Sequence, residues 1–226
     1  MANTTIEIVA GGHGLSTRSI YSRSLAERRG LTLGIGIGLG LMAFMVAALF
    51  ESMATTLNEI DLPESMDIFL AGSPIDTATG WMNAEVYSLM APIAILALAV
   101  VDGSKSFATE EEERRIGLLA ANPVGRSRIL LEKSLALVTH IVVASALLGL
   151  LMWLGALAFG LDLSPDGIAA ATLHLIGLGV MFSGLTVAVA VLTGRRVPTV
   201  VAVASLGGLM YLVATFFPLN DSLADF

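Results

Sequence analysis

Residues 31–50 read LTLGIGIGLGLMAFMVAALF, twenty residues with no Asp, Glu, Lys or Arg among them. A helix needs about 20 mainly apolar residues to cross a hydrocarbon core of about 30 Å. Glycine alternates with Leu and Ile early in this stretch, as in a strand, but the apolar run continues without a break from Leu41 to Phe50. That length favours a helix. We therefore predict a membrane-spanning helix at 31–50.

Four further apolar segments have the length of a span, namely 84–101, 134–159, 167–193 and 197–217. Backbone polar groups in lipid must be paired within the segment, so such segments are helices unless they close into a barrel. Barrel strands alternate apolar and polar residues, and these segments do not. Only 14% of the 226 residues are charged and none is cysteine, whereas soluble domains have about 25% charged residues. The predicted fold is an all-α, polytopic helical membrane protein with five spans.

The basic residues give the predicted orientation. All twelve Lys and Arg residues lie before the first span, between the second and third, or between the fourth and fifth. The segments on the other side carry Asp and Glu but no Lys or Arg. Lys and Arg mark the cytoplasmic side of a membrane. We therefore place segments 1–30 and 102–133 inside the cell, and the acidic loop 51–83 and the tail 218–226 outside.

Four glycines in the first span are spaced for close helix packing. Gly34 with Gly38, and Gly36 with Gly40, form two overlapping pairs of small residues four positions apart, a spacing that lets two helices approach closely. The partner helix could belong to the same subunit or to a second subunit, and the spacing leaves both alternatives open.

The sequence has no motif for catalysis. Gly103-Ser104-Lys105-Ser106 lacks the first glycine and the preceding strand of a phosphate-binding loop. We expect no Asp deep in any span, and His140 and His174 sit too far apart along the membrane normal to form one site. The spans then offer almost nothing for relaying ions or protons, which disfavours a secondary transporter. We expect a chain that is not an enzyme and binds no cofactor, metal or nucleic acid.

The inner segment 102–133 reads DGSKSFATEEEERRIGLLAANPVGRSRILLEK. Its acidic stretch 110–113 is followed by Ile116-Gly117 and Leu118-Leu119, then by Pro123-Val124-Gly125-Arg126, and finally by Lys133 at the start of the third span. This order resembles the inner segment of type-2 ATP-binding-cassette (ABC) transporter permeases, and the order of spans and loops resembles that family over most of the chain. The family normally has six spans, so the chain is expected to be truncated, a short variant, or completed by a helix from another chain.

The resemblance implies a coupling helix that docks on a separate ABC ATP-binding subunit, which would hold ATP and Mg. It also implies an ATP-driven exporter whose substrate path lies between this chain and a second permease copy, in a homo- or heterodimer. Such a permease would be a multi-pass protein of the plasma membrane of a prokaryotic cell. Arg126 and Arg128 would hold the segment to lipid headgroups or to acidic partner residues. The full set of docking residues implied is Glu113, Arg114, Arg115, Ile116, Gly117, Leu118, Leu119, Pro123, Arg126 and Arg128.

Two other function classes stay open from the sequence. One is a non-transporting membrane anchor or assembly protein, and the other is an autonomous channel or carrier. Neither the substrate nor the direction of transport is indicated by the residues.

Overall fold

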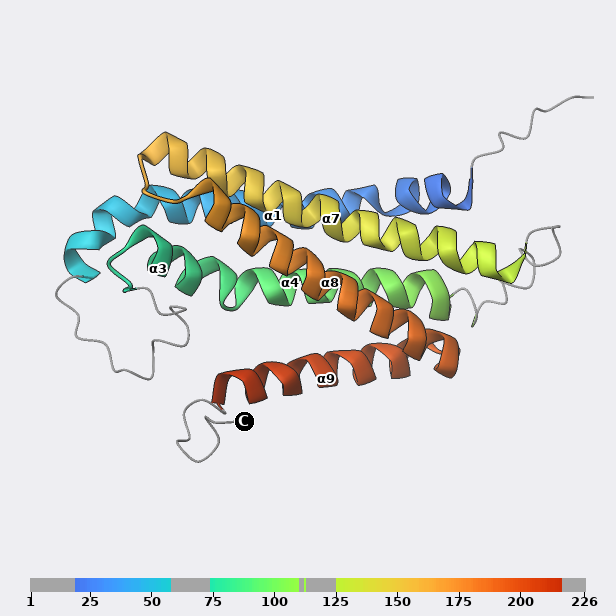
Figure 1. The fold of residues 1–226 in the computed structure, drawn as a ribbon. Coiled ribbons are helices and arrows are strands. Elements are labelled where there is room, and N and C mark those ends of the chain that lie inside the picture. The colour runs from blue at the N-terminus through green and yellow to red at the C-terminus, as the bar shows by residue number, and fades with distance from the viewer. Residues whose placement is uncertain (1–18, 58–73, 110–111, 113–124, 217–226) are drawn as a thin grey trace, which may run out of the picture.

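The computed structural model describes residues 19–57, 74–109, 112 and 125–216, and every regular element in these ranges is a helix (Figure 1). Within these ranges, five helical stretches are long and apolar enough to cross a membrane. The all-α, five-span prediction is thereby confirmed. The elements are α1 (Ile20–Leu57), α3 (Ala78–Met82), the π-helix η2 (Asn83–Tyr87), α4 (Met90–Ser104), the π-helix η3 (Lys105–Thr109), α7 (Arg126–Phe159), α8 (Pro165–Thr193) and α9 (Arg196–Phe216).

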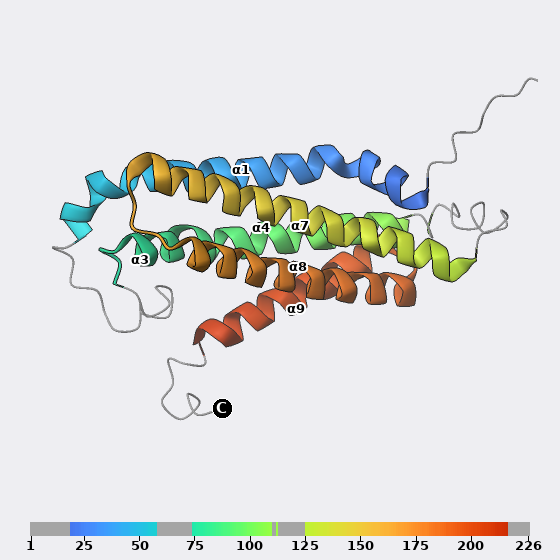
Figure 2. The same ribbon diagram turned by 45° about the horizontal axis from the view of Figure 1, so that its top comes forward.

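The helices run alternately up and down, so α1 and α7 are parallel to one another, as are α4 and α8. The longest contact in the bundle joins α1 to α7, and α4 packs on α8. Helix α9 lies against α8 and α4, at the side of the bundle away from α1 (Figures 1 and 2).

Glycines 36 and 40 bring α1 against α7. A Cβ added to Gly36 would lie 2.9 Å from the Cα of Ala144, and one added to Gly40 would lie 2.8 Å from the Cβ of Leu151. Gly34 and Gly38 are exposed and would meet nothing within 4 Å. The two alternatives for the predicted glycine pairs therefore separate. One pair packs inside the subunit, and the other lies on the outward face of α1.

The helices extend beyond the predicted spans. Helix α1 has 38 residues and α7 has 34, lengths of about 57 and 51 Å at about 1.5 Å per residue. The second span runs from Ala78 to Thr109 through two π-helical segments, whereas we expected 84–101. The sequence places the start of the inner segment at residue 102, but residues 102–109 belong to α4 and η3. Below, "inner segment" means residues 110–125, between η3 and α7.

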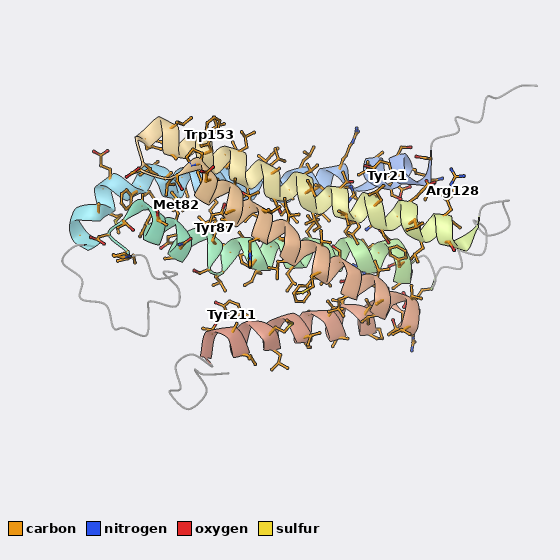
Figure 3. All side chains as sticks on the ribbon, in the orientation of Figure 1. Tyr21, Met82, Tyr87, Arg128, Trp153 and Tyr211 are labelled. Atoms are coloured by element: carbon orange, nitrogen blue, oxygen red, sulfur yellow. The ribbon has the colours of Figure 1, made fainter. Side chains whose placement is uncertain are left out.

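Among the described residues, Lys and Arg are confined to one end of the bundle. We call "basic end" the end formed by the start of α1, η3, the start of α7 and the turn between α8 and α9, because it carries every described Lys and Arg. We call "acidic end" the opposite end, which carries Glu51, Asp76, Asp162 and Asp166. Figure 3 shows Tyr21 and Arg128 at the basic end and Trp153 near the acidic end.

Candidate functional site

Most of the predicted docking residues lie outside the described part of the chain. Of the ten, the structure describes the backbone of Arg126, which begins α7, and the side chain of Arg128. Arg128 Nε pairs with Glu132 Oε1 at 2.7 Å, one turn further along α7. The residues that fall outside the described ranges are Glu113, Arg114, Arg115, Ile116, Gly117, Leu118, Leu119 and Pro123.

Glu132 links the start of α7 to the start of α1. Its Oε2 accepts a hydrogen bond of 3.0 Å from the backbone N–H of Tyr21, one of the N–H groups in the first turn of α1 that have no partner within the helix. The hydroxyl of Tyr21 lies 3.1 Å from that of Thr139. The first turn of α1 is therefore fixed to α7 by two polar contacts at the basic end.

Lys133 joins the two helices that flank the inner segment. Its side chain is buried, and its Nζ donates a hydrogen bond of 3.0 Å to the carbonyl of Ser106 in η3. The ammonium also lies 5.8 Å from the centre of the Phe107 ring, within reach of a cation–π attraction. The helix before the inner segment, η3, and the helix after it, α7, are therefore bonded to one another.

Glu112 contacts the start of α9. Its Oε1 accepts a hydrogen bond of 3.0 Å from the backbone N–H of Arg196, and a carboxylate at a helix N-terminus is favoured by the helix dipole. Helix α8 ends just before, at Thr193, and its C-cap Gly194 has a φ of 58°, which suits glycine. The inner segment is consequently joined to the turn between α8 and α9.

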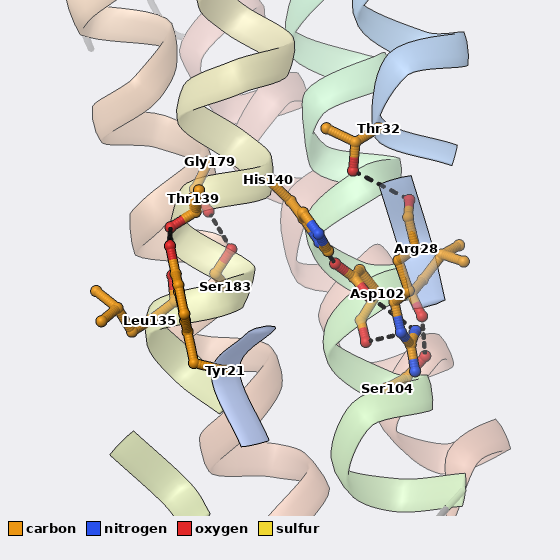
Figure 4. A network of polar contacts seen from close by, with 11 residues as sticks. Tyr21, Arg28, Thr32, Asp102, Ser104, Leu135, Thr139, His140, Gly179 and Ser183 are labelled. Atoms are coloured by element: carbon orange, nitrogen blue, oxygen red, sulfur yellow. Dashed lines mark hydrogen bonds and ion pairs between the residues drawn. The ribbon is translucent and has the colours of Figure 1, made fainter. Parts of the chain in front are cut away.

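A buried polar triad, formed by Arg28 of α1, Asp102 of α4 and His140 of α7, lies just inside these contacts (Figure 4). Arg28 Nη1 is 2.8 Å from Asp102 Oδ1 and also donates to the Asp102 carbonyl at 3.1 Å. His140 Nδ1 lies 2.5 Å from Asp102 Oδ2. The Asp102 side chain is 1% exposed and that of His140 is 4% exposed.

Helix direction explains why these side chains meet. A Cα–Cβ bond tilts toward the N-terminus of its helix. Helix α7 starts at the basic end, so His140 tilts back toward that end, whereas α4 ends there and Asp102 tilts into the bundle. The two side chains converge between α4 and α7, and Arg28 reaches them from α1. Three helices therefore share one carboxylate.

The triad corrects the expectation that no Asp lies deep in a span, because Asp102 is buried within the stretch Ala78–Thr109. Asp102 was assigned to the inner segment because a charge normally ends an apolar run, but α4 continues to Ser104. A signal existed, since Asp102 is the one acidic residue between positions 86 and 109. His140 Nε2 is buried without a hydrogen-bond partner among the described residues, whereas His174 is exposed on α8.

The triad is a packed cluster of side chains. The neighbouring Gly103 holds α4 against α8, because a Cβ added there would lie 2.8 Å from Thr186 Cγ2. Within the described ranges, no group of three His, Asp or Glu side chains is arranged to hold a metal ion. A buried carboxylate is stable only when it is paired and hydrogen-bonded, and Arg28 and His140 supply both. The arrangement therefore fixes three helices relative to one another where the inner segment begins.

Comparison with known proteins gives one match. The model of a family described as "Multidrug efflux system permease Rv1217c, C-terminal domain" matches residues 24–226. This range covers all five spans and the inner segment. No curated protein and no solved structure matches the chain.

Proposed function

This chain belongs to the family of the multidrug efflux system permease Rv1217c, C-terminal domain, and we propose that it is the membrane-spanning subunit of an ATP-driven ABC exporter. Family membership supports the coarser role, that of a permease component of an efflux system. Coupling to ATP hydrolysis is the proposed part. The observation that carries it is a pair of contacts around the inner segment. Lys133 bonds its two flanking helices to each other, and Glu112 within it bonds to the start of α9.

The contacts at the basic end would let movement of the inner segment, caused by a bound partner, move the attached helices. Lys133 bonds the start of α7 to η3 through Ser106, and Glu112 bonds the segment to the start of α9. A partner that displaced the middle of the inner segment would move these helix ends with it. The charged residues of α1, α7 and α9 at this end favour a partner that binds outside the membrane, on the side predicted to be cytoplasmic.

In this proposal the chain hydrolyses nothing and binds no cofactor. ATP and Mg are held by the ABC ATP-binding subunit, which docks on the ten predicted residues between Glu113 and Arg128. A second permease copy completes the substrate path, and the outward face of α1 that carries Gly34 and Gly38 is open to it. The complex resides in the plasma membrane of a prokaryotic cell and uses no nucleic acid.

The test replaces three apolar residues of the inner segment. We expect Ile116→Ala, Leu118→Ala and Leu119→Ala together to abolish recovery of an ATPase subunit with the tagged chain, because these side chains would fill the docking groove. The matched control replaces three exposed leucines of α7 with alanine, namely Leu130, Leu131 and Leu135. Loss of the ATPase from both variants, or from neither, would contradict the docking proposal.

The triad favours a second candidate, an autonomous carrier. Ionisable groups buried within a membrane segment commonly lie on ion or proton pathways, and Asp102 and His140 are such groups. The discriminating measurement uses the purified chain alone in liposomes loaded with ethidium, a fluorescent lipophilic cation. Flux that follows an imposed pH gradient without nucleotide supports the carrier, whereas flux only with the ATPase and ATP supports the exporter. An anchor or assembly protein would give association without flux.

A further inference from the structure

We propose that Asp102 is a positioning residue that transmits movement of the inner segment to α1 and α7, through its ion pair with Arg28 and its hydrogen bond with His140. The inference rests on the proposed exporter function. It adds a specific joint, by which we mean the contacts of Asp102 with Arg28 and His140 that connect α4 to α1 and α7. Asp102 touches neither substrate nor nucleotide in this scheme.

The first step of the argument is the position of Asp102. It lies one turn before Lys105, where η3 begins, and η3 leads directly into the inner segment. Ser106 and Phe107 of η3 are held by Lys133 of α7. Displacement of the inner segment therefore reaches Asp102 through less than two turns of continuous helix, about 1.5 Å of rise per residue.

The second step is the kind of contact that Asp102 makes. Beside the triad, α4 meets α8 through Gly103 and the methyl group of Thr186, an apolar contact without a directional bond. The triad is different, because it is charged, directional and buried. An unpaired carboxylate in this environment is strongly disfavoured. Arg28 and His140 must therefore follow Asp102 when it moves.

The third step concerns the helices that carry Arg28 and His140. Arg28 belongs to α1 and His140 to α7, the pair with the longest contact in the bundle. Gly36 and Gly40 lock this pair together further along. A shift of Asp102 would consequently move α1 and α7 as one body, and α1 carries the outward face open to a second copy. This route joins the predicted docking segment to the predicted substrate path.

A merely structural triad would give a different result from a transmitting one. Replacing all three members with apolar residues of similar size removes the charges together and leaves no buried ion unpaired, which commonly preserves stability. If the triad only stabilises the fold, Arg28→Met with Asp102→Leu and His140→Leu (the "apolar triple variant") should transport normally. If the triad transmits movement, the variant should fold and hydrolyse ATP but transport poorly.

The experiment uses the full chain purified with its copurifying ATPase and reconstituted in liposomes. ATP hydrolysis and ethidium transport are measured on the same vesicles, and the readout is ethidium moved per ATP hydrolysed. For the apolar triple variant we expect this ratio to fall by between about twofold and about thirtyfold, the range in which residues along a coupling route act. Arg28→Lys, which keeps the charge, should retain more of the ratio. An unchanged ratio in the apolar triple variant would overturn the proposal.

Two additions keep the test decisive. If the apolar triple variant does not fold, Asp102→Asn keeps the shape of the side chain while removing its charge, and the same fall in the ratio is expected.

If the wild-type chain recovers no ATPase, the exporter function itself is refuted. In that case spin labels on cysteines introduced at the exposed Arg29 and Lys105 still test the joint, since the chain has no native cysteine. We expect a broader distance distribution in the apolar triple variant, and an unchanged one would overturn the joint.

Discussion

Packing of α1 on α7 predicts opposite outcomes for two neighbouring glycines. Gly36→Ala places a methyl group 2.9 Å from the Cα of Ala144, a backbone atom that cannot rotate away. Gly38→Ala, two residues further along the same helix, places the same methyl group where no atom lies within 4 Å. The two variants have the same composition, so their difference reports the local packing alone.

The expected magnitudes follow from these distances. A methyl group forced into a packed contact destabilises by about 1–3 kcal/mol, and here α1 and α7 must separate to admit it. Alanine in an open helical position is instead favoured over glycine by up to about 1 kcal/mol. We therefore expect Gly36→Ala to lower the free energy of unfolding and Gly38→Ala to leave it unchanged or raise it.

The assay is reversible unfolding of the purified chain in mixed micelles with increasing fractions of sodium dodecyl sulfate, followed by the loss of helical circular dichroism. Equal free energies of unfolding for the two glycine variants, or a larger loss in Gly38→Ala, would refute the assignment of Gly36 to the interior contact.

Three other predictions concern substitutions of residues near the basic end. Asp102→Leu leaves a buried cation without its partner, so the free energy of unfolding should fall by about 3–5 kcal/mol, whereas the apolar triple variant should lie close to the wild type; the same micelle titration measures both. Lys133→Met keeps the apolar stem but removes the bond to Ser106, a charged hydrogen bond worth about 1.5–3 kcal/mol, so amide hydrogen exchange in η3 should accelerate about tenfold or more. Gly103→Val drives two methyl groups against Thr186 and should destabilise by about 1–3 kcal/mol, with partial recovery when Thr186→Ala is added. A stable Asp102→Leu, unchanged exchange in η3, or no recovery from Thr186→Ala would each contradict the corresponding contact.

The spans could be predicted from the sequence because two independent properties agreed. Apolar length marked five segments, and all twelve basic residues fell on one side of them. The helix ends could not be predicted in the same way. Helix α1 starts at Ile20 although the apolar run starts at residue 31, because polar residues outside the hydrocarbon core remain compatible with a helix.

The buried triad was missed for a physical reason. Hydropathy treats Asp102 as the end of an apolar run, and only the tertiary structure shows that Arg28 and His140 neutralise and hydrogen-bond it. Arg28 and His140 are far from Asp102 in sequence, so no local spacing joins them. The glycine spacing, in the same way, indicated close packing without indicating which face of α1 meets α7. The docking residues from Glu113 to Leu119 stay predictions.

The most direct test of the account asks which part of the chain touches the ATPase in the cell. A photo-crosslinking amino acid is introduced at Leu118 in the inner segment and, as a matched control, at Leu157, an exposed apolar residue of α7 toward the acidic end. Adducts are isolated after irradiation of intact cells and identified by mass spectrometry. The account predicts an adduct with an ABC ATP-binding subunit at position 118 and none at 157. An ATPase adduct at 157, or an ATPase that copurifies without any adduct at 118, would contradict it.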